Sequence, residues 1–281
     1  MGSEMCIRDS NVKVEVPIQT CLLMHKNMSL QAPHNIIIVG DNAELHVITG
    51  CTIMREAPGI HAGVTEIYVG RNSKVTYTMI HGWSLLQHVR PRTGIMVEEG
   101  GEYISHYITM APSKTLQTDP KVYLEGENAK AHLSSVVIGV KEAVIDVGGA
   151  IFLNGKQTSG EIVSRALAKD NAKVTSRAFI LGGNVGSKGH VECMGLLLSS
   201  TASIKTVPML EAKVDDVELT HEASIGKIAE EKILYLMARG FSRDEATSMI
   251  VRGFMSVSIT GIPEKLKKAI EHTIDIISKG L

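Results

Sequence analysis

The sequence predicts a mainly β protein, a right-handed parallel β-helix (solenoid) closed by a C-terminal α-helical cap. Three observations support this prediction. A short phrase recurs about every 28 to 30 residues, and each copy contains one alternating run rich in Val, Ile and Thr. Near Gly226 the alternation gives way to helical periodicity. Stacked strands followed by helices are the arrangement that these patterns indicate.

The repeated phrase is a polar or glycine turn, then a small residue, then alternating charged and aliphatic positions. Its clearest copies have their small residue at Ala43, Ser73, Gly101, Ala129, Ala172 and Ala202. These positions are 30, 28, 28, 43 and 30 residues apart, and the interval of 43 divides into 14 and 29 when Ala143 is included. A unit of 14 to 15 residues therefore pairs into turns of 28 to 30.

Each unit is interpreted as a strand because apolar and polar residues alternate between Gly, Asn and Asp. Strands that recur at a constant interval without helices between them can stack in parallel, each turn about 4.8 Å above the last. A left-handed hexapeptide solenoid would show a six-residue beat, which the sequence lacks. A β-sandwich, which also has frequent turns, stays open as an alternative.

The C-terminal region has a period of 3.6 residues from Ala229 onward. The first helix is expected to end at Gly240, Ser242 and Glu245 form a capping box for a second helix, and Pro263 opens a third. The expected apolar faces are, in order, Ile233, Leu236 and Met237; Ala246, Met249, Ile250 and Phe254; and Leu266, Ile270, Ile274 and Ile277. Such helices either protect the end of the solenoid or dock a partner.

The patterns divide the chain into three parts. Residues 1–10 lack periodicity and are expected to be a disordered leader or one foreign to the natural chain. Residues 11–226 form the solenoid core, and residues 227–281 form a helical domain.

The composition excludes several classes of function. The formal net charge of -1 gives no field that would favour nucleic acid, and the apolar runs are too short to span a membrane. Four cysteines are too sparse for a disulfide framework, and no secretory leader precedes them. We therefore expect a cytoplasmic protein that binds neither nucleic acid nor membrane.

Cys193 is the first candidate for chemistry. It lies 28 residues before His221 and 29 before Glu222, so a turn of that length would bring thiol, imidazole and carboxylate together on adjacent turns. These groups suit iron, zinc or an iron–sulfur cluster. The alternative is that Cys193 is a small core residue. Cys21 and Cys51 also lie 30 apart, and we expect a core role for both.

Other motifs are weaker. The stretch GGNVGSKGH (182–190) lacks the spacing of a phosphate-binding loop, so we expect no ATP on this chain. His81, Trp83 and His88 form a local cluster that we assign to the edge of the core rather than to a surface site.

The segment from Cys193 onward resembles the C-terminal core of the SufB and SufD proteins, the scaffold subunits of the SUF iron–sulfur cluster assembly system. Its most distinctive stretches are VPMLEAKVDDVELTHEASIGKI (207–228) and YLMARGFSRDEATSMIVRGF (235–254). The resemblance extends over residues 12–259 and is strongest after about Gly148.

The resemblance implies a right-handed β-helix core and C-terminal helices that dock SufC, an ATPase of the ABC type. We expect the docking contacts at Tyr235, Arg239, Phe241 and Phe254. In SufB the cysteine and glutamate that match Cys193 and Glu222 are implicated in cluster assembly, and in SufD the histidine that matches His221 takes part. This chain carries all three, which suggests a SufB-type or single-scaffold subunit, homodimeric or paired with a SufB or SufD paralogue.

The expected function is therefore a scaffold on which an iron–sulfur cluster is transiently built from iron and from sulfur brought by a donor protein. Cys193 would accept sulfur and bind iron, with His221 and Glu222 completing the metal site. The partner, and not this chain, would hydrolyse ATP. Two alternatives stay open: a β-helix carbohydrate-active enzyme, and an interaction module that holds an ATPase without chemistry of its own.

Overall fold

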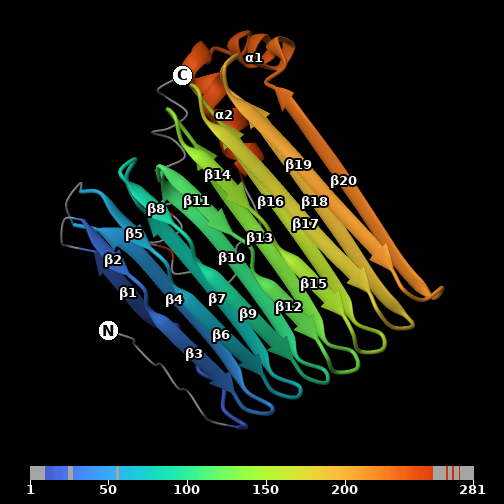
Figure 1. The fold of residues 1–281 in the computed structure, drawn as a ribbon. Coiled ribbons are helices and arrows are strands. Elements are labelled where there is room, and N and C mark those ends of the chain that lie inside the picture. Colours follow the sequence, from blue (N-terminus) through green and yellow to red (C-terminus); the bar gives the residue numbers. More distant parts are fainter. Residues whose placement is uncertain are drawn as a thin grey trace.

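The computed structural model describes residues 10–24, 28–54 and 57–255, together with Glu264, Lys268 and His272, which are helical. In this part of the chain the fold is mainly parallel β, a solenoid of about seven turns with two helices near the C-terminus (Figure 1). The predicted β-helix with a helical cap is confirmed, and the β-sandwich alternative is wrong because every strand pairing in these residues is parallel. The expected leader lies almost wholly outside the described residues.

Two sheets form the walls of the solenoid. One contains β1 (Ile18–Met24), β4 (Glu44–Ile53), β7 (Lys74–Gly82), β10 (Glu102–Ala111), β13 (Lys130–Gly139), β16 (Ser159–Ala168), β18 (Ser187–Leu197) and β20 (Val217–Lys227). The other contains β2 (Ser29–Gln31), β3 (His34–Val39), β5 (Gly59–His61), β6 (Val64–Val69), β8 (Gln87–Val89), β9 (Arg92–Val97), β11 (Thr115–Thr118), β12 (Lys121–Leu124), β14 (Val144–Val147), β15 (Ala150–Leu153), β17 (Lys173–Gly182) and β19 (Ser203–Ala212).

The sequence repeat marks the corners between strands. Asn42, Asn72 and Asn128 adopt left-handed backbone angles, with φ of 54°, 52° and 59°, and each precedes a buried small residue. The pairing register shows turns of 27 to 30 residues, from Lys121 beside Gly94 to Lys74 beside Glu44. The interval of 43 residues separates Ala129, which precedes β13 of the first sheet, from Ala172. It arises because the copies at Ala143, Ala172 and Ala202 lie at a different corner, before β14, β17 and β19 of the second sheet.

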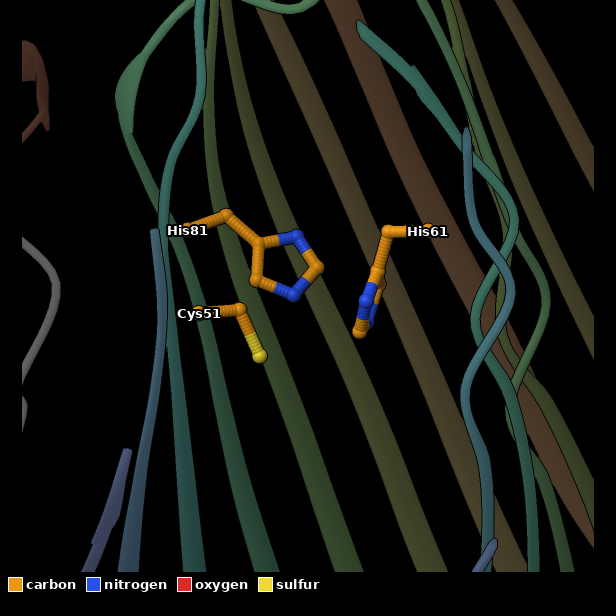
Figure 2. A group of neighbouring side chains, drawn as sticks. All are labelled: Cys51, His61 and His81. Carbon is orange, nitrogen blue, oxygen red and sulfur yellow. The ribbon is translucent and has the colours of Figure 1, made fainter. Parts of the chain in front are cut away.

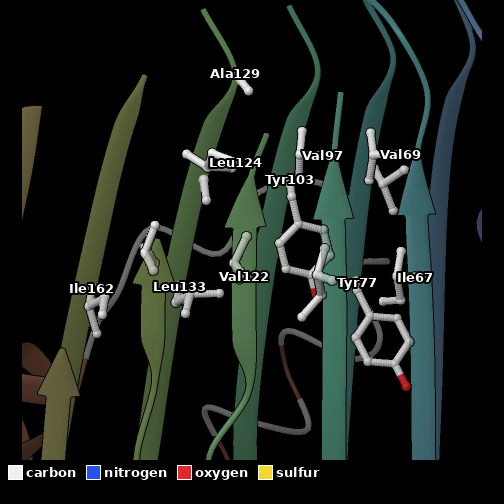
Figure 3. Close-up of a cluster of buried hydrophobic side chains, with 14 of the residues drawn as sticks. Ile67, Val69, Tyr77, Val97, Tyr103, Val122, Leu124, Ala129, Leu133 and Ile162 are labelled. Atoms are coloured by element: carbon white, nitrogen blue, oxygen red, sulfur yellow. The ribbon is translucent and has the colours of Figure 1, made fainter. Parts of the chain in front are cut away.

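The interior is filled by stacked aliphatic side chains. Val69, Val97 and Leu124 lie on successive turns (Figure 3), and Leu153 lies on the next turn. Each of these four side chains is at most 1% exposed. Burying one such side chain stabilises the fold by about 1.5–3 kcal/mol relative to leaving it in water. A repeated aliphatic column therefore holds the turns together despite the small number of aromatic residues.

The helices α1 (Glu230–Met237) and α2 (Arg243–Met255) follow the last strand. Gly240, with φ of 95°, ends the first helix as predicted. The predicted capping box is also confirmed, because the Ser242 backbone N–H donates to Glu245 Oε2 at 2.8 Å and the Glu245 N–H donates to Ser242 Oγ at 3.3 Å. Glu230 and Arg243 form a bidentate ion pair that joins α1 to α2.

The buried face of α2 differs from the predicted stripe. Ala246 is buried as expected, but Met249 is 41% exposed, and Val251 and Met255 take the inward positions. These two side chains contact a core cluster that includes Leu167 of β16. In α1, Ile233 is buried as predicted while Met237 is exposed. The apolar face predicted for a third helix lies outside the described residues.

Candidate functional site

Cys193 lies near the middle of β18, close to the C-terminal end of the stack. Its side chain points into the core and is 0% exposed. The alternation of the strand places it beside Ser164 of β16, its register partner. The Ser176 hydroxyl donates a long hydrogen bond to the Cys193 sulfur at 3.9 Å. The thiol is therefore a protected interior group with one weak polar contact.

The electrostatic surroundings of Cys193 keep its thiol protonated. Burial raises the pKa of the Cys193 thiol, and the Glu192 carboxylate raises it further. The hydrogen bond from Ser176 and the charge of Arg165 act in the opposite direction. Arg165 and Glu192 form an ion pair at 2.5 Å. A metal ion at Cys193 would have to replace the thiol proton.

The register of β18 and β20 decides which residues meet Cys193. One turn takes 30 residues here, so Ala223 is the direct neighbour of Cys193 and the assumed spacing of 28 is two residues short. His221 pairs with Val191, which places it diagonally from Cys193 on the same face of the sheet, roughly 8 Å away between Cα atoms. Glu222 pairs with Glu192 and lies on the opposite face.

Among the residues that the structure describes, no further strand pairs with the last turn of the solenoid, so that turn is open. β20 ends its sheet, and most of its residues, including His221 and Glu222, are exposed. β19 pairs with β17 at the end of the other sheet, and its Met209 is 47% exposed. Figure 1 shows both strands at the end of the stack beneath the helices. An edge with free backbone groups and apolar side chains is a template for pairing with another chain.

Hydroxyl groups line part of the interior next to Cys193. Ser176 Oγ lies 2.8 Å from Ser164 Oγ, and Ser135 donates to the same Ser164 oxygen at 3.1 Å. These serines, with Tyr107 and other inward side chains of both sheets, surround a cavity of about 40 Å³. Hydroxyl groups therefore lie among the apolar side chains of the interior near Cys193.

The residues expected to dock a partner lie on or beside the helices. Tyr235 is 57% exposed, and the Arg239 guanidinium lies 4.4 Å from the centre of its ring. Phe241 is 38% exposed in the link between the helices. Phe254 is half-buried against the cluster that contains Val251. Three of the four side chains are thus accessible to a partner, whereas Phe254 contributes to holding α2 on the solenoid.

A second group of possible ligands was not predicted as a site. Cys51, His61 and His81 are buried together in the early turns, with Trp83 beside them. The assignment of Cys51, His81 and Trp83 to the core is confirmed, and His88, which was assigned with them to the edge of the core, is half-buried on β8. The core role expected for Cys21 is wrong because its side chain is exposed. Cys51 pairs with Leu22, so the two cysteines are offset by one residue.

Comparison with known proteins places this architecture in a defined class. Residues 22–254 match the model for the SufBD core domain of SUF-system iron–sulfur cluster assembly proteins. The chain is 46% identical over 269 residues to an iron–sulfur cluster assembly SufBD family protein of Archaeoglobus fulgidus, which covers 96% of this chain and 72% of that protein. It is 37% identical over 273 residues to a SufBD family protein of Pyrococcus horikoshii, covering 96% of this chain and 60% of that one.

The chain therefore belongs to the SufBD family of iron–sulfur cluster assembly proteins. A third relative, a SufBD family protein of Methanothermobacter thermautotrophicus, is 44% identical over 266 residues, and this chain spans 65% of its length. The match lies within the range of 12–259 expected from the sequence. Within the described ranges no helix has the length and apolar character that crossing a bilayer requires.

Proposed function

We propose that this chain is a cytoplasmic scaffold on which an iron–sulfur cluster is assembled, with Cys193 accepting sulfur and binding iron. The observation that supports this most is the position of Cys193, a buried thiol one strand away from the open end of the solenoid. Membership of the SufBD family favours this function over a carbohydrate-active enzyme. In this proposal the chain supplies ligands and performs no catalysis of its own.

The pairing register limits which residues one protomer can supply. Cys193 and His221 share a face and form the first part of the site, whereas Glu222 projects from the other face of β20. Further ligands would come from a second chain paired along the exposed edge, either another copy or a SufB or SufD paralogue. In that arrangement Glu222 serves as a ligand or as a base toward the facing chain.

Access to Cys193 requires movement of the last strand, because Ala223 of β20 lies beside it and the thiol is fully buried. β20 ends at Lys227 and α1 begins at Glu230, so a displacement of the helices acts directly on this strand. We propose that ATP hydrolysis by a SufC-type partner bound to the helices moves β20 and opens the site to a sulfur donor protein.

Anaerobic reconstitution tests the role of Cys193. With ferrous iron and a sulfur source, the parent protein is expected to hold a cluster, and Cys193→Ala is expected to hold at least tenfold less iron and sulfide per chain. Cys21→Ala is the matched control, since Cys21 is an exposed cysteine on β1 at the other end of the stack. A Cys193→Ala protein that assembles as much cluster as the parent would exclude this assignment.

Binding of the ATPase partner is tested at Tyr235. An exposed tyrosine stacked by an arginine has the properties of an interface anchor, so Tyr235→Ala should weaken binding of a SufC-type ATPase at least about 30-fold. Tyr68→Ala is the matched control, because Tyr68 is a similarly accessible tyrosine on β6, away from the helices. Calorimetric titration measures both, and equal affinity of the two variants would place the partner elsewhere.

A further inference from the structure

Three side chains that can bind metals converge inside the early turns. Cys51 of β4 and His81 of β7 are register partners on one wall, and His61 of β5 faces them from the other sheet (Figure 2). Each is at most 1% exposed. One ligand atom from each residue lies within 4.8 Å of those of the other two. The group lies several turns before Cys193, and Tyr107, whose hydroxyl contacts His81, also lines the cavity that Ser164 and Ser176 share near Cys193.

Neighbouring side chains orient both imidazole rings. Nδ1 of His61 lies 2.9 Å from Oε1 of Gln31, and Nδ1 of His81 lies 2.8 Å from the Tyr107 hydroxyl. Nε2 of His81 is buried and has no hydrogen-bond partner among the residues that the structure describes. A buried imidazole nitrogen without a partner is costly, and metal-bound histidines characteristically use the other ring nitrogen for such an orienting contact.

The protonation states of the histidines also suit a metal ion. Burial lowers the pKa of His61 to about 4 and that of His81 to about 3, so both rings are neutral near pH 7 and each has a free lone pair. Burial raises the pKa of the Cys51 thiol to about 12, so it is protonated. The indole ring of Trp83, whose centre is 4.9 Å from that of His61, adds an aromatic wall.

We propose that Cys51, His61 and His81 bind one divalent transition-metal ion of borderline softness, Fe²⁺ or Zn²⁺, at a site in the early turns that does not use Cys193 as a ligand. Two imidazoles and one thiolate match the ligand preference of these ions and leave a fourth position open. At ordinary bond lengths the ligand atoms of a tetrahedral site lie about 3.3–3.7 Å apart. The three ligand atoms lie within 4.8 Å of one another, so small side-chain rotations bring them to the separations of a tetrahedral site. The ion displaces the Cys51 proton, which is released to solvent, and no electron is transferred.

Cobalt titration of the full chain under anaerobic conditions tests this site. Co²⁺ should bind one per chain, with the d–d bands of a tetrahedral centre and a thiolate-to-cobalt charge-transfer band. Cys51→Ser should lose the charge-transfer band, and His81→Phe, which keeps the ring volume, should weaken Co²⁺ binding at least 100-fold. Gln31→Ala should weaken it about tenfold, because the His61 ring loses its orienting contact. Zn²⁺ and Fe²⁺ should each displace Co²⁺, and their relative affinities identify the preferred ion.

Two controls separate this inference from the proposed function and from misfolding. Cys193→Ala and Cys21→Ala should bind Co²⁺ as the parent does, even where cluster assembly is lost. Zn²⁺ should raise the thermal unfolding temperature of the parent but leave that of His81→Phe unchanged, which shows in a folded protein that the ion acts through this group. Absence of tight Co²⁺ binding, a spectrum unaffected by Cys51→Ser, or failure of both Zn²⁺ and Fe²⁺ to displace Co²⁺ would overturn the proposal.

Discussion

Gly126→Ala is expected to lower the free energy of unfolding by about 3 kcal/mol or more, because no space exists for a methyl group at this corner of the stack. A Cβ on Gly126 would lie 1.9 Å from the backbone nitrogen of Glu99, on the preceding turn. On the following turn, a Cβ on Gly155 would lie 2.2 Å from the Gly126 carbonyl oxygen. Because backbone atoms of the neighbouring turns lie on both sides, no side-chain rotation can relieve the clash, and the turns must move apart.

The matched control for this substitution is Gly94→Ala. Gly94 lies on the exposed face of β9, and a Cβ there would meet nothing within 4 Å. Alanine at that position should leave stability unchanged or raise it by about 0.5–1 kcal/mol, since the unfolded chain loses freedom. Urea unfolding followed by circular dichroism compares the two. Equal midpoints for Gly126→Ala and the parent would show that the turns are not in backbone contact there.

Acid should destabilise the protein through His106 as the pH falls from about 6.5 to 4. Burial, helped by the charges of His132 and His46, lowers the pKa of His106 from 6.5 to about 4. Between these two pH values the His106 ring is protonated in the unfolded chain but not in the folded chain. The free energy of unfolding therefore falls as the pH is lowered from 6.5 to 4. At about 1.4 kcal/mol per pH unit, the titration of His106 lowers the free energy of unfolding by about 3 kcal/mol over this interval.

The His106→Asn variant removes the titrating ring while keeping a polar group near the Ser134 hydroxyl, which lies 2.7 Å from His106 Nδ1. Urea unfolding at pH 7.5 and at pH 4.5 gives the loss of stability for parent and variant. The parent should lose about 3 kcal/mol more than His106→Asn over this interval, whatever their difference at pH 7.5. Equal losses would mean that the His106 imidazole takes up its proton without cost in the folded protein.

The solenoid could be predicted because its cause is local and repeated. At the corners where β4, β7 and β13 begin, a left-handed residue is followed by a small one, and pairs such as Asn42 with Ala43 and Asn128 with Ala129 are visible directly in the sequence. The buried face of α2 could not be predicted from a local pattern in this way. Its inward face is set by the position of Leu167 and its neighbours on the solenoid, so Val251 and Met255 are buried where helical periodicity alone favoured Met249.

The candidate sites were predictable only to the accuracy of the turn length. Turns vary between 27 and 30 residues, and a difference of one moves a side chain to the other face of a strand, as happens for Glu222. The interval of 30 between Cys51 and His81 equals the local turn, so this pair could have been found from the repeat. His61 could not, because the path of the chain into the opposite sheet decides which of its residues face inward.

The position of iron in the assembled complex tests the central claim most directly. Crystals of the anaerobically reconstituted protein, measured at the iron absorption edge, locate iron by anomalous scattering. We predict a cluster peak within bonding distance of Cys193 Sγ, on the His221 face of β20 and against the open edge of the solenoid. A cluster bound elsewhere, with Cys193 still enclosed behind Ala223, would contradict the account.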